Sequence, residues 1–281
     1  ILFEARIQRS LDVGVCQKEI RIRNMSAAPS LVDTSSARVT NYSDLNLTSN
    51  ESGYNELETA FSMFRDHIVG NTAISVGGLQ LGAFIGGMAK TGKEFKRVIC
   101  VDINPVMKIF WNSMAQIIKE SETSSIAREK TINLLRLDKA DPSTLLSKAL
   151  TLDPTIEQDA FKYLLSRNAR DIRSHPSTKW LIDPSDETDY QSVRKVFIED
   201  RFKFMLGNLF EESFLEELSS ITDNVGFIYF TNICDYIKPP LPKGATERER
   251  LQHRHDDISP TECIDNINLL FRLLTSRRIL S

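Results

Sequence analysis

The spacing of apolar residues changes along the chain, and each spacing predicts a different kind of element. In residues 1–24, the segments FEARIQ and KEIRIR place an apolar residue at every second position, which is the period of a half-exposed strand and indicates a small hairpin. Residues 25–54 are rich in Ser, Asn and Thr and indicate an irregular arm. A helical period follows, and Gly70 stands where that helix would end; its apolar positions are Leu57, Phe61, Phe64 and Ile68.

Two apolar strands with a glycine turn and a helix between them come next. TAISVGG (72–78) is a short apolar strand that ends in glycine, and LQLGAFIGGMAKTG (79–92) is rich in small residues suited to a tight turn and a closely packed helix. KRVICVD (96–102) is the second strand. PVMKIFWNSMAQIIKE (105–120) predicts a helix with proline near its first turn. This order is a βαβ unit, which implies parallel strands and a right-handed crossover.

The remaining pattern completes an α/β fold, with a mainly parallel sheet flanked by helices. Residues from about 120 to 200 have helical periods and no strand pattern, so we interpret them as a helical insertion. FKFML (202–206) predicts a third strand, and the apolar run VGFIYFTNICDYI (225–237) predicts a fourth that is buried on both faces. A last amphipathic helix is expected at 261–274. We therefore divide the chain into an N-terminal hairpin and arm (1–55) and one larger domain (56–281).

Charge and cysteine content narrow the class of protein. The chain has 35 basic and 38 acidic residues, a net charge of -3, which gives no bulk attraction to nucleic acid or to an acidic membrane. No apolar run approaches the roughly 18 residues of a transmembrane helix. Its four cysteines are widely spaced and form no CxxC pair, so we predict no metal knuckle and a reducing, cytoplasmic location. His253 and His255 are expected to lie in a solvated charged segment.

One segment matches most of a phosphate-binding loop but is rejected. GMAKTGK (87–93) fits the pattern G-x4-G-K, but Glu94 follows where the motif requires a hydroxyl side chain. A phosphate-binding loop must also open into a helix whose amides face the phosphates. Here a strand is predicted within about five residues, so we do not interpret the segment as a nucleotide site.

Asp102 is the most informative polar residue, because it ends the second strand beside the glycine turn of the first. At that position a carboxylate can accept hydrogen bonds from both hydroxyls of a ribose. The simpler interpretation is that Asp102 caps the helix that begins near Pro105. Asn104 is better placed for that role, which leaves Asp102 free to bind a ligand.

In these features the sequence resembles the Rossmann-like, class I S-adenosylmethionine-dependent methyltransferases. VDINPVM (101–107) is similar to the family's ribose-binding motif, and MLGNLFEESF (205–214) to the third-strand end that holds the adenine. The run at 225–237 is similar to the fourth strand, whose end lies near the methyl group. The resemblance implies S-adenosylmethionine as cofactor, bound by Gly77, Gly78, Leu79, Gly82, Asp102, Ile103, Asn208, Leu209 and Thr231.

The resemblance also implies where catalysis and recognition would occur. Candidate catalytic residues are Asn232, Asp235 and Tyr236, past the fourth strand, although for Asp235 the favoured interpretation is the cap of the following turn. The acceptor is expected to be a small molecule or a protein rather than nucleic acid. The helical insertion, with Trp180, is the expected site of substrate or partner recognition and a possible lid over the cofactor. Its basic residues Arg167, Arg170 and Arg173 are spaced to share one helix face, which a solvated surface also explains.

Departures from the family pattern keep two alternatives open. Ser75 stands where the family has an acid, and Leu79 replaces its second glycine. About 45 residues follow the fourth strand, room for one loop and one helix, so either the chain is incomplete or the N-terminal hairpin or a partner completes the sheet. A catalytically inactive, methyltransferase-like scaffold protein is the first alternative. A nicotinamide-dependent enzyme is the second, although its G-x-G-x-x-G spacing is absent.

Overall fold

The structure is a computed structural model of the 281-residue chain. It describes residues 70–207 without a break, together with residues 45, 47–48, 61–63, 66, 68, 212–222 and 225–229. The hairpin expected at 1–24, the domain boundary at residue 55 and the helix expected at 261–274 lie outside the described residues. Across the described part of the chain, no helix combines the length and the apolar character needed to cross a membrane.

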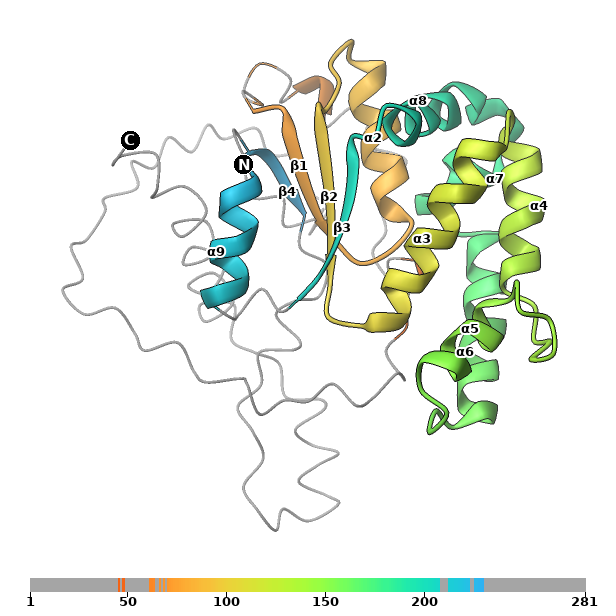
Figure 1. Ribbon diagram of the computed structural model, residues 1–281. Coiled ribbons are helices and arrows are strands. Elements are labelled where there is room, and N and C mark those ends of the chain that lie inside the picture. Colours follow the sequence, from red (N-terminus) through yellow and green to blue (C-terminus); the bar gives the residue numbers. More distant parts are fainter. Residues whose placement is uncertain are drawn as a thin grey trace, which may run out of the picture.

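Within the described residues, four parallel strands form the central sheet (Figure 1). They are β1 (Thr72–Val76), β2 (Arg97–Asp102), β3 (Phe202–Leu206) and β4 (Val225–Tyr229). Their spatial order is β3-β2-β1-β4, and every neighbouring pair is parallel. The predicted α/β fold with a parallel, Rossmann-like sheet is therefore confirmed, and each of these strands lies where the apolar pattern predicted it.

Two helices connect to the central strands as the sequence indicated. α2 (Gln80–Lys90) joins β1 to β2, and α3 (Pro105–Glu120) follows β2. Asn104 caps α3, because its side chain accepts a hydrogen bond from the Val106 amide. The segment GMAKTGK forms the last turn of α2 and the loop that leads into β2, which confirms that it is not a phosphate-binding loop.

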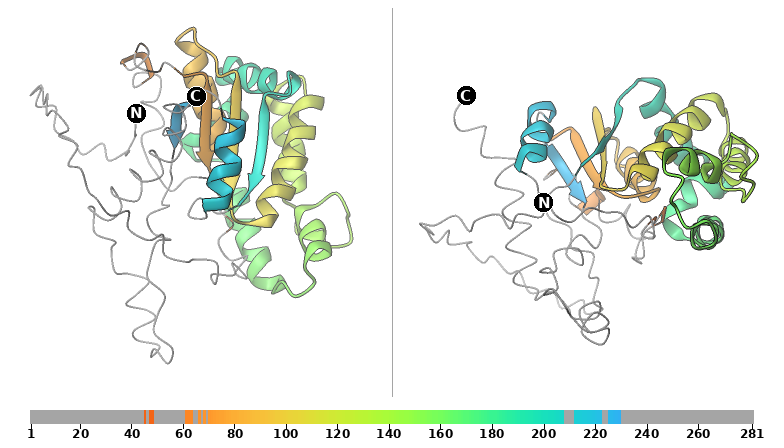
Figure 2. Two further views of the ribbon diagram at one scale, coloured as in Figure 1. Left: turned by 60° about the vertical axis from the view of Figure 1, so that its left-hand side comes forward. Right: turned by 60° about the horizontal axis from the view of Figure 1, so that its bottom comes forward.

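The segment between α3 and β3 is helical, as predicted. It contains the 3-10 turns Pro176–Thr178 and Pro184–Asp186 and the helices α4 (Ser124–Leu134), α5 (Leu145–Leu152), α6 (Gln158–Ile172), α7 (Lys179–Ile182) and α8 (Glu187–Ile198). α8 packs along α2 and α3, and α7 also contacts α2. Figures 1 and 2 show these helices on the same side of the sheet as α2 and α3, so the insertion thickens one helical layer.

The two faces of the sheet are buried under different cores. Ala73, Val98 and Cys100 face the larger core beneath α2, α3 and α8. On the opposite face, Ile74 and Ile99 form a smaller core, to which α9 (Glu212–Ile221) contributes apolar side chains. Figure 1 shows α9 alone on that side among the described helices. Central strands covered on both faces explain the continuous apolar runs of β1 and β2.

The strand order also locates the place where such folds bind ligands. The chain moves from β1 to β2 to β3 in one direction and then returns through α9 to place β4 on the other side of β1. The direction of winding therefore reverses between β1 and β4. Ligands of open α/β sheets bind outside the carboxyl ends of the strands at such a reversal.

Candidate functional site

The carboxyl edge of the sheet brings the glycine turn and Asp102 together. β1 and β2 are paired so that Val76 lies opposite Val101, and the Gly77 amide donates a hydrogen bond to the Val101 carbonyl at 3.2 Å. On the other side of β2, the Gly207 amide donates to the Asp102 carbonyl at 3.0 Å. Asp102 thus lies between the end of β1 and the end of β3, and its place beside β1 is the one that the predicted βαβ unit required.

Asp102 carries a carboxyl group in an environment that disfavours its charge. Burial raises the pKa of this carboxyl from 3.8 to about 6, although the backbone amides of Asn104 and Ile103 lower it by hydrogen bonding. The Asn104 amide donates to Asp102 Oδ1 at 2.8 Å. The side chain is partly exposed, so solvent or a ligand reaches it. Near neutral pH the chain therefore keeps a carboxylate at the strand end at an energetic cost.

Asn104, and not Asp102, is the cap of α3. Its Oδ1 accepts the Val106 amide at 2.9 Å, which is the alternative that the sequence favoured. Asn104 is 4% exposed, and its Nδ2 has no hydrogen-bond partner within the described residues. A buried donor without an acceptor is costly, because it has lost its hydration and gained nothing in return.

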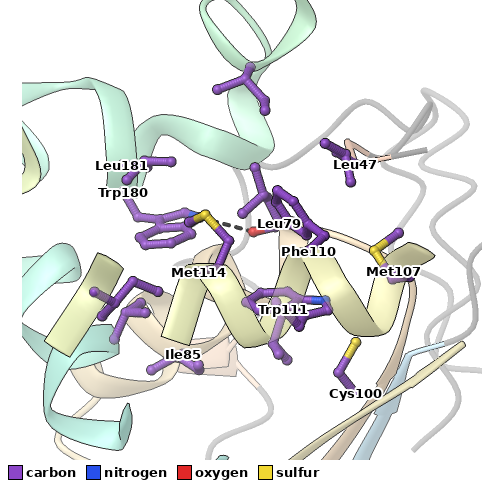
Figure 3. Close-up of a cluster of buried hydrophobic side chains, with 14 of the residues drawn as sticks. Leu47, Leu79, Ile85, Cys100, Met107, Phe110, Trp111, Met114, Trp180 and Leu181 are labelled. Carbon is purple, nitrogen blue, oxygen red and sulfur yellow. Dashed lines mark hydrogen bonds between the residues drawn. The ribbon is translucent and has the colours of Figure 1, made fainter. Parts of the chain in front are cut away.

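The carbonyl groups of the glycine turn are held from the core side, and Figure 3 shows this for Leu79, whose oxygen is bound by Trp180. Gly77 has φ 92°, a conformation that favours glycine, and its carbonyl accepts hydrogen bonds from Cys100 Sγ at 2.9 Å and from Trp111 Nε1 at 3.3 Å. The Leu79 carbonyl accepts Trp180 Nε1 at 2.9 Å. Trp111 and Trp180 are the two tryptophans of the chain, so both indole donors bind this turn.

Two of the glycines in this region make room for the chain itself. A Cβ on Gly82 would lie 2.1 Å from Cε2 of Trp180, so only glycine lets the indole pack against α2. A Cβ on Gly78 would lie 2.2 Å from the carbonyl oxygen of Leu47. Neither contact was predicted. The small residues of α2 were a partial signal, since they indicated close packing without naming the partner.

The role expected for Trp180 is therefore corrected. The sequence named this residue with the insertion as the expected site of substrate or partner recognition, but its side chain is 1% exposed and stacks at 8° to the ring of Tyr190. Trp180 is a core residue that supports the glycine turn. Arg170 and Arg173 are exposed at the end of α6, in agreement with a solvated face, and Arg167 is partly buried near Asp171.

Gln80 is a further polar residue at this edge, and sequence reasoning did not single it out. Its Nε2 donates to the Val76 carbonyl at 2.7 Å, and its Oε1 is buried without a hydrogen-bond partner among the described residues. The backbone amide of Gly78 makes no hydrogen bond within the same residues. An unused acceptor and an unused donor therefore lie at the end of β1.

Apolar side chains flank Asp102 at the same edge. Ile103, directly after it, is 40% exposed, and Leu206, at the end of β3, is 43% exposed. The pairing of Asp102 with Leu206 places these side chains at the ends of neighbouring strands. Exposed apolar side chains beside a carboxylate suit a ligand that has both an apolar and a hydroxyl-bearing part.

Several predicted site residues are not tested by this geometry. The remaining cofactor-binding candidates, Asn208, Leu209 and Thr231, lie outside the described residues. The same holds for the catalytic candidates Asn232, Asp235 and Tyr236. No protein-family model matches the chain, and no curated protein sequence matches it. Functional inference therefore depends on the fold and on the residues at the carboxyl edge.

Proposed function

We propose that the protein is an S-adenosylmethionine-dependent methyltransferase. The observation that carries the proposal is Asp102: a carboxyl group at the tip of β2, beside the glycine turn of β1, kept at a site that raises its pKa to about 6. The sheet order, with β1 next to both β2 and β4, supports a ligand at this edge. A cofactor with a ribose would use the carboxylate as the acceptor for its two hydroxyls.

Neighbouring groups support the rest of such a cofactor. Ile103 and Leu206 would contact a planar base, because their exposed apolar surface gains from being covered. The Gly78 amide and Gln80 Oε1, which have no partner among the described residues, would offer one donor and one acceptor to the polar end of the ligand. Gly77, Leu79 and Gly82 act in this proposal by shaping the turn rather than by direct contact.

The chemistry would take place past the end of β4. Methyl transfer from a sulfonium is an in-line displacement for which the cofactor supplies the reactive group, so the protein must align the acceptor and remove its proton. Asn232, Asp235 and Tyr236 follow β4 in the sequence, and β4 ends beside β1. We propose them for that role. We further propose a small-molecule or protein acceptor and a cytoplasmic location.

The glycine turn favours a second candidate function, an inactive methyltransferase-like scaffold. Leu79 replaces the family's second glycine, and both its backbone groups are already used: its amide donates to Leu47 and its carbonyl accepts Trp180 Nε1. Ser75, which replaces the family's acid, is fully buried. In this turn the protein's own groups use backbone atoms that would otherwise be open to a cofactor. That arrangement is expected of a protein that keeps the methyltransferase-like fold and no longer binds the cofactor.

Calorimetric titration with S-adenosylmethionine and, separately, S-adenosylhomocysteine decides between the two. For an active cofactor site we expect one-to-one binding in the micromolar range, and Asp102→Ala should weaken it by about 3 kcal/mol, more than a hundredfold, through lost ribose hydrogen bonds. Glu129→Ala, which removes an exposed acid on α4, is the matched control and should bind as the parent does. Absence of binding to the folded parent would favour the scaffold, and binding of a reduced nicotinamide dinucleotide instead would favour the oxidoreductase.

A further inference from the structure

One buried side chain of the insertion holds a distant piece of the N-terminal arm. Asn168, on α6, is 1% exposed and uses its whole amide group. Its Oδ1 accepts the Leu47 amide at 2.8 Å, and its Nδ2 donates to the Leu45 carbonyl at 2.8 Å and to the Leu164 carbonyl at 2.9 Å. The side chain therefore holds Leu47 from across 121 positions of sequence.

Leu47 in turn holds the glycine turn. Its carbonyl accepts the Leu79 amide at 2.7 Å, and the same carbonyl lies where a Cβ on Gly78 would be. Leu45 and Leu47 are both fully buried in the larger core, which fixes them on the helical layer. A continuous hydrogen-bonded path thus runs from α6 through Leu47 to the turn, and Trp180 holds the far side of Leu79.

We infer that Asn168 is a positioning residue for the candidate binding site, acting on the glycine turn through Leu47. Leu79 precedes α2, so its amide has no acceptor within that helix, and Leu47 supplies one. Leu79 is held on both sides, and it follows directly after Gly78, whose amide makes no hydrogen bond within the described residues. Leu45 and Leu47 are in this sense part of the site, although their effect on a ligand rests on the proposed function.

If Asn168 positions the glycine turn, its loss should speed amide exchange in the turn more than in the sheet. If it only stabilises the fold, exchange should speed up in both. Asn168→Leu keeps the size of the side chain and removes its three hydrogen bonds. We expect hydrogen exchange of the Leu79 amide to accelerate at least tenfold relative to that of Ile99 in β2, because the Leu79 amide loses its fixed acceptor. Thr144→Val is the matched control, since Thr144 is also fully buried and joins its helix to the preceding loop by hydrogen bonds. That variant should leave the ratio of the two rates unchanged.

Gly78→Ala disturbs the same contact, between the Leu79 amide and the Leu47 carbonyl, from the side of the turn. It replaces Asn168→Leu in the test if that variant does not fold. Its added Cβ would displace the Leu47 carbonyl, so it should also expose the Leu79 amide. The double variant should then show little more acceleration than the stronger single variant, because both act through one contact. Acceleration factors that multiply, or an unchanged Leu79 rate in Asn168→Leu, would overturn the inference.

A second measurement tests ligand binding: S-adenosylhomocysteine is titrated into the 281-residue chain. We expect Asn168→Leu to weaken binding about tenfold, while Thr144→Val binds as the parent does. If the parent does not bind, the proposed function fails, yet the exchange measurements still decide whether Asn168 positions the turn. If the parent binds and Asn168→Leu binds equally well despite faster Leu79 exchange, the assignment of Asn168 to the binding site is wrong.

Discussion

The glycine turn after β1 and the tip of β2 are neighbours at one edge of the sheet, but they differ in how far their polar groups find hydrogen-bond partners within the protein. In the turn, the carbonyls of Gly77 and Leu79 are bound by indole donors and the Leu79 amide by Leu47. At the tip, burial raises the pKa of Asp102, and the side-chain Nδ2 of Asn104 has no partner among the described residues. The carbonyls of Gly77 and Leu79 are thus paired within the protein, although the Gly78 amide and Gln80 Oε1 find no partner among the described residues, whereas the tip of β2 holds a buried carboxyl group at an energetic cost.

This difference indicates that the turn contributes mainly to stability and that the tip of β2 is kept for function. A turn whose carbonyls are paired internally contributes to folding, and Gly78 and Gly82 are explained by the packing of Leu47 and Trp180. The raised pKa of Asp102, about 6 instead of 3.8, comes from burial of the carboxyl group and corresponds to about 3 kcal/mol of lost stability at neutral pH. Groups held at such a cost are characteristic of sites that meet a ligand.

The largest change in the free energy of unfolding is expected for a substitution that removes the support of the glycine turn. Trp180→Ala removes a 1% exposed indole and its hydrogen bond to Leu79, so it should lower the free energy of unfolding by about 3–5 kcal/mol. Urea denaturation measures this change. Tyr163→Ala, on α6 and 66% exposed, is the aromatic control and should cost less than about 0.5 kcal/mol. Equal effects would mean that the turn is not built by packing.

At the tip of β2, by contrast, a substitution is expected to raise the free energy of unfolding. Asp102→Asn removes the buried charge while an amide oxygen still accepts the Asn104 amide, so without ligand the variant should be more stable by about 3 kcal/mol above pH 6. Between pH 3.8 and about 6 the native parent keeps a proton that the unfolded chain releases, so the parent loses stability as the pH rises through this window. The advantage of Asp102→Asn should therefore vanish below pH 3.8.

Urea denaturation of parent and variant from pH 3.5 to 8 measures this dependence. An advantage that does not change with pH, or a less stable variant at pH 8, would contradict the assigned cost. The same variant should bind S-adenosylhomocysteine more weakly than the parent, because the carboxylate is lost. A change that stabilises the protein and weakens binding is the signature expected of a functional group rather than a structural one.

The smallest effect concerns the helix cap. Asn104→Ala removes the acceptor of the Val106 amide and should cost about 1 kcal/mol, measured as a lower urea midpoint with unchanged slope. Thr123→Ala removes the corresponding cap of α4, whose hydrogen bond to Ile126 is longer at 3.4 Å, and should cost less. A loss above about 3 kcal/mol for Asn104→Ala would show that Asn104 does more than cap α3.

Much of the fold follows from local pattern, because its signals lie within short windows. The apolar runs of β1, β2 and β3, the Pro105 start of α3 and the Asn104 cap were all predicted at the residues where they occur. The position of Asp102 beside the glycine turn also followed, since two parallel strands joined by a crossover must place their carboxyl ends together. The helical nature of residues 120–200 was equally readable.

The sequence by itself therefore determined the elements, the parallel sheet and the carboxylate at its edge. Only the tertiary structure decided which side chains support that edge: Trp180 lies 101 residues from the carbonyl it binds, and Asn168 lies 121 from Leu47. Such contacts leave no periodicity, because chain geometry fixes neighbours only within an element, while packing between elements selects among many partners. For the same reason the sequence associated Trp180 with substrate or partner recognition, whereas close packing on Gly82 buries it.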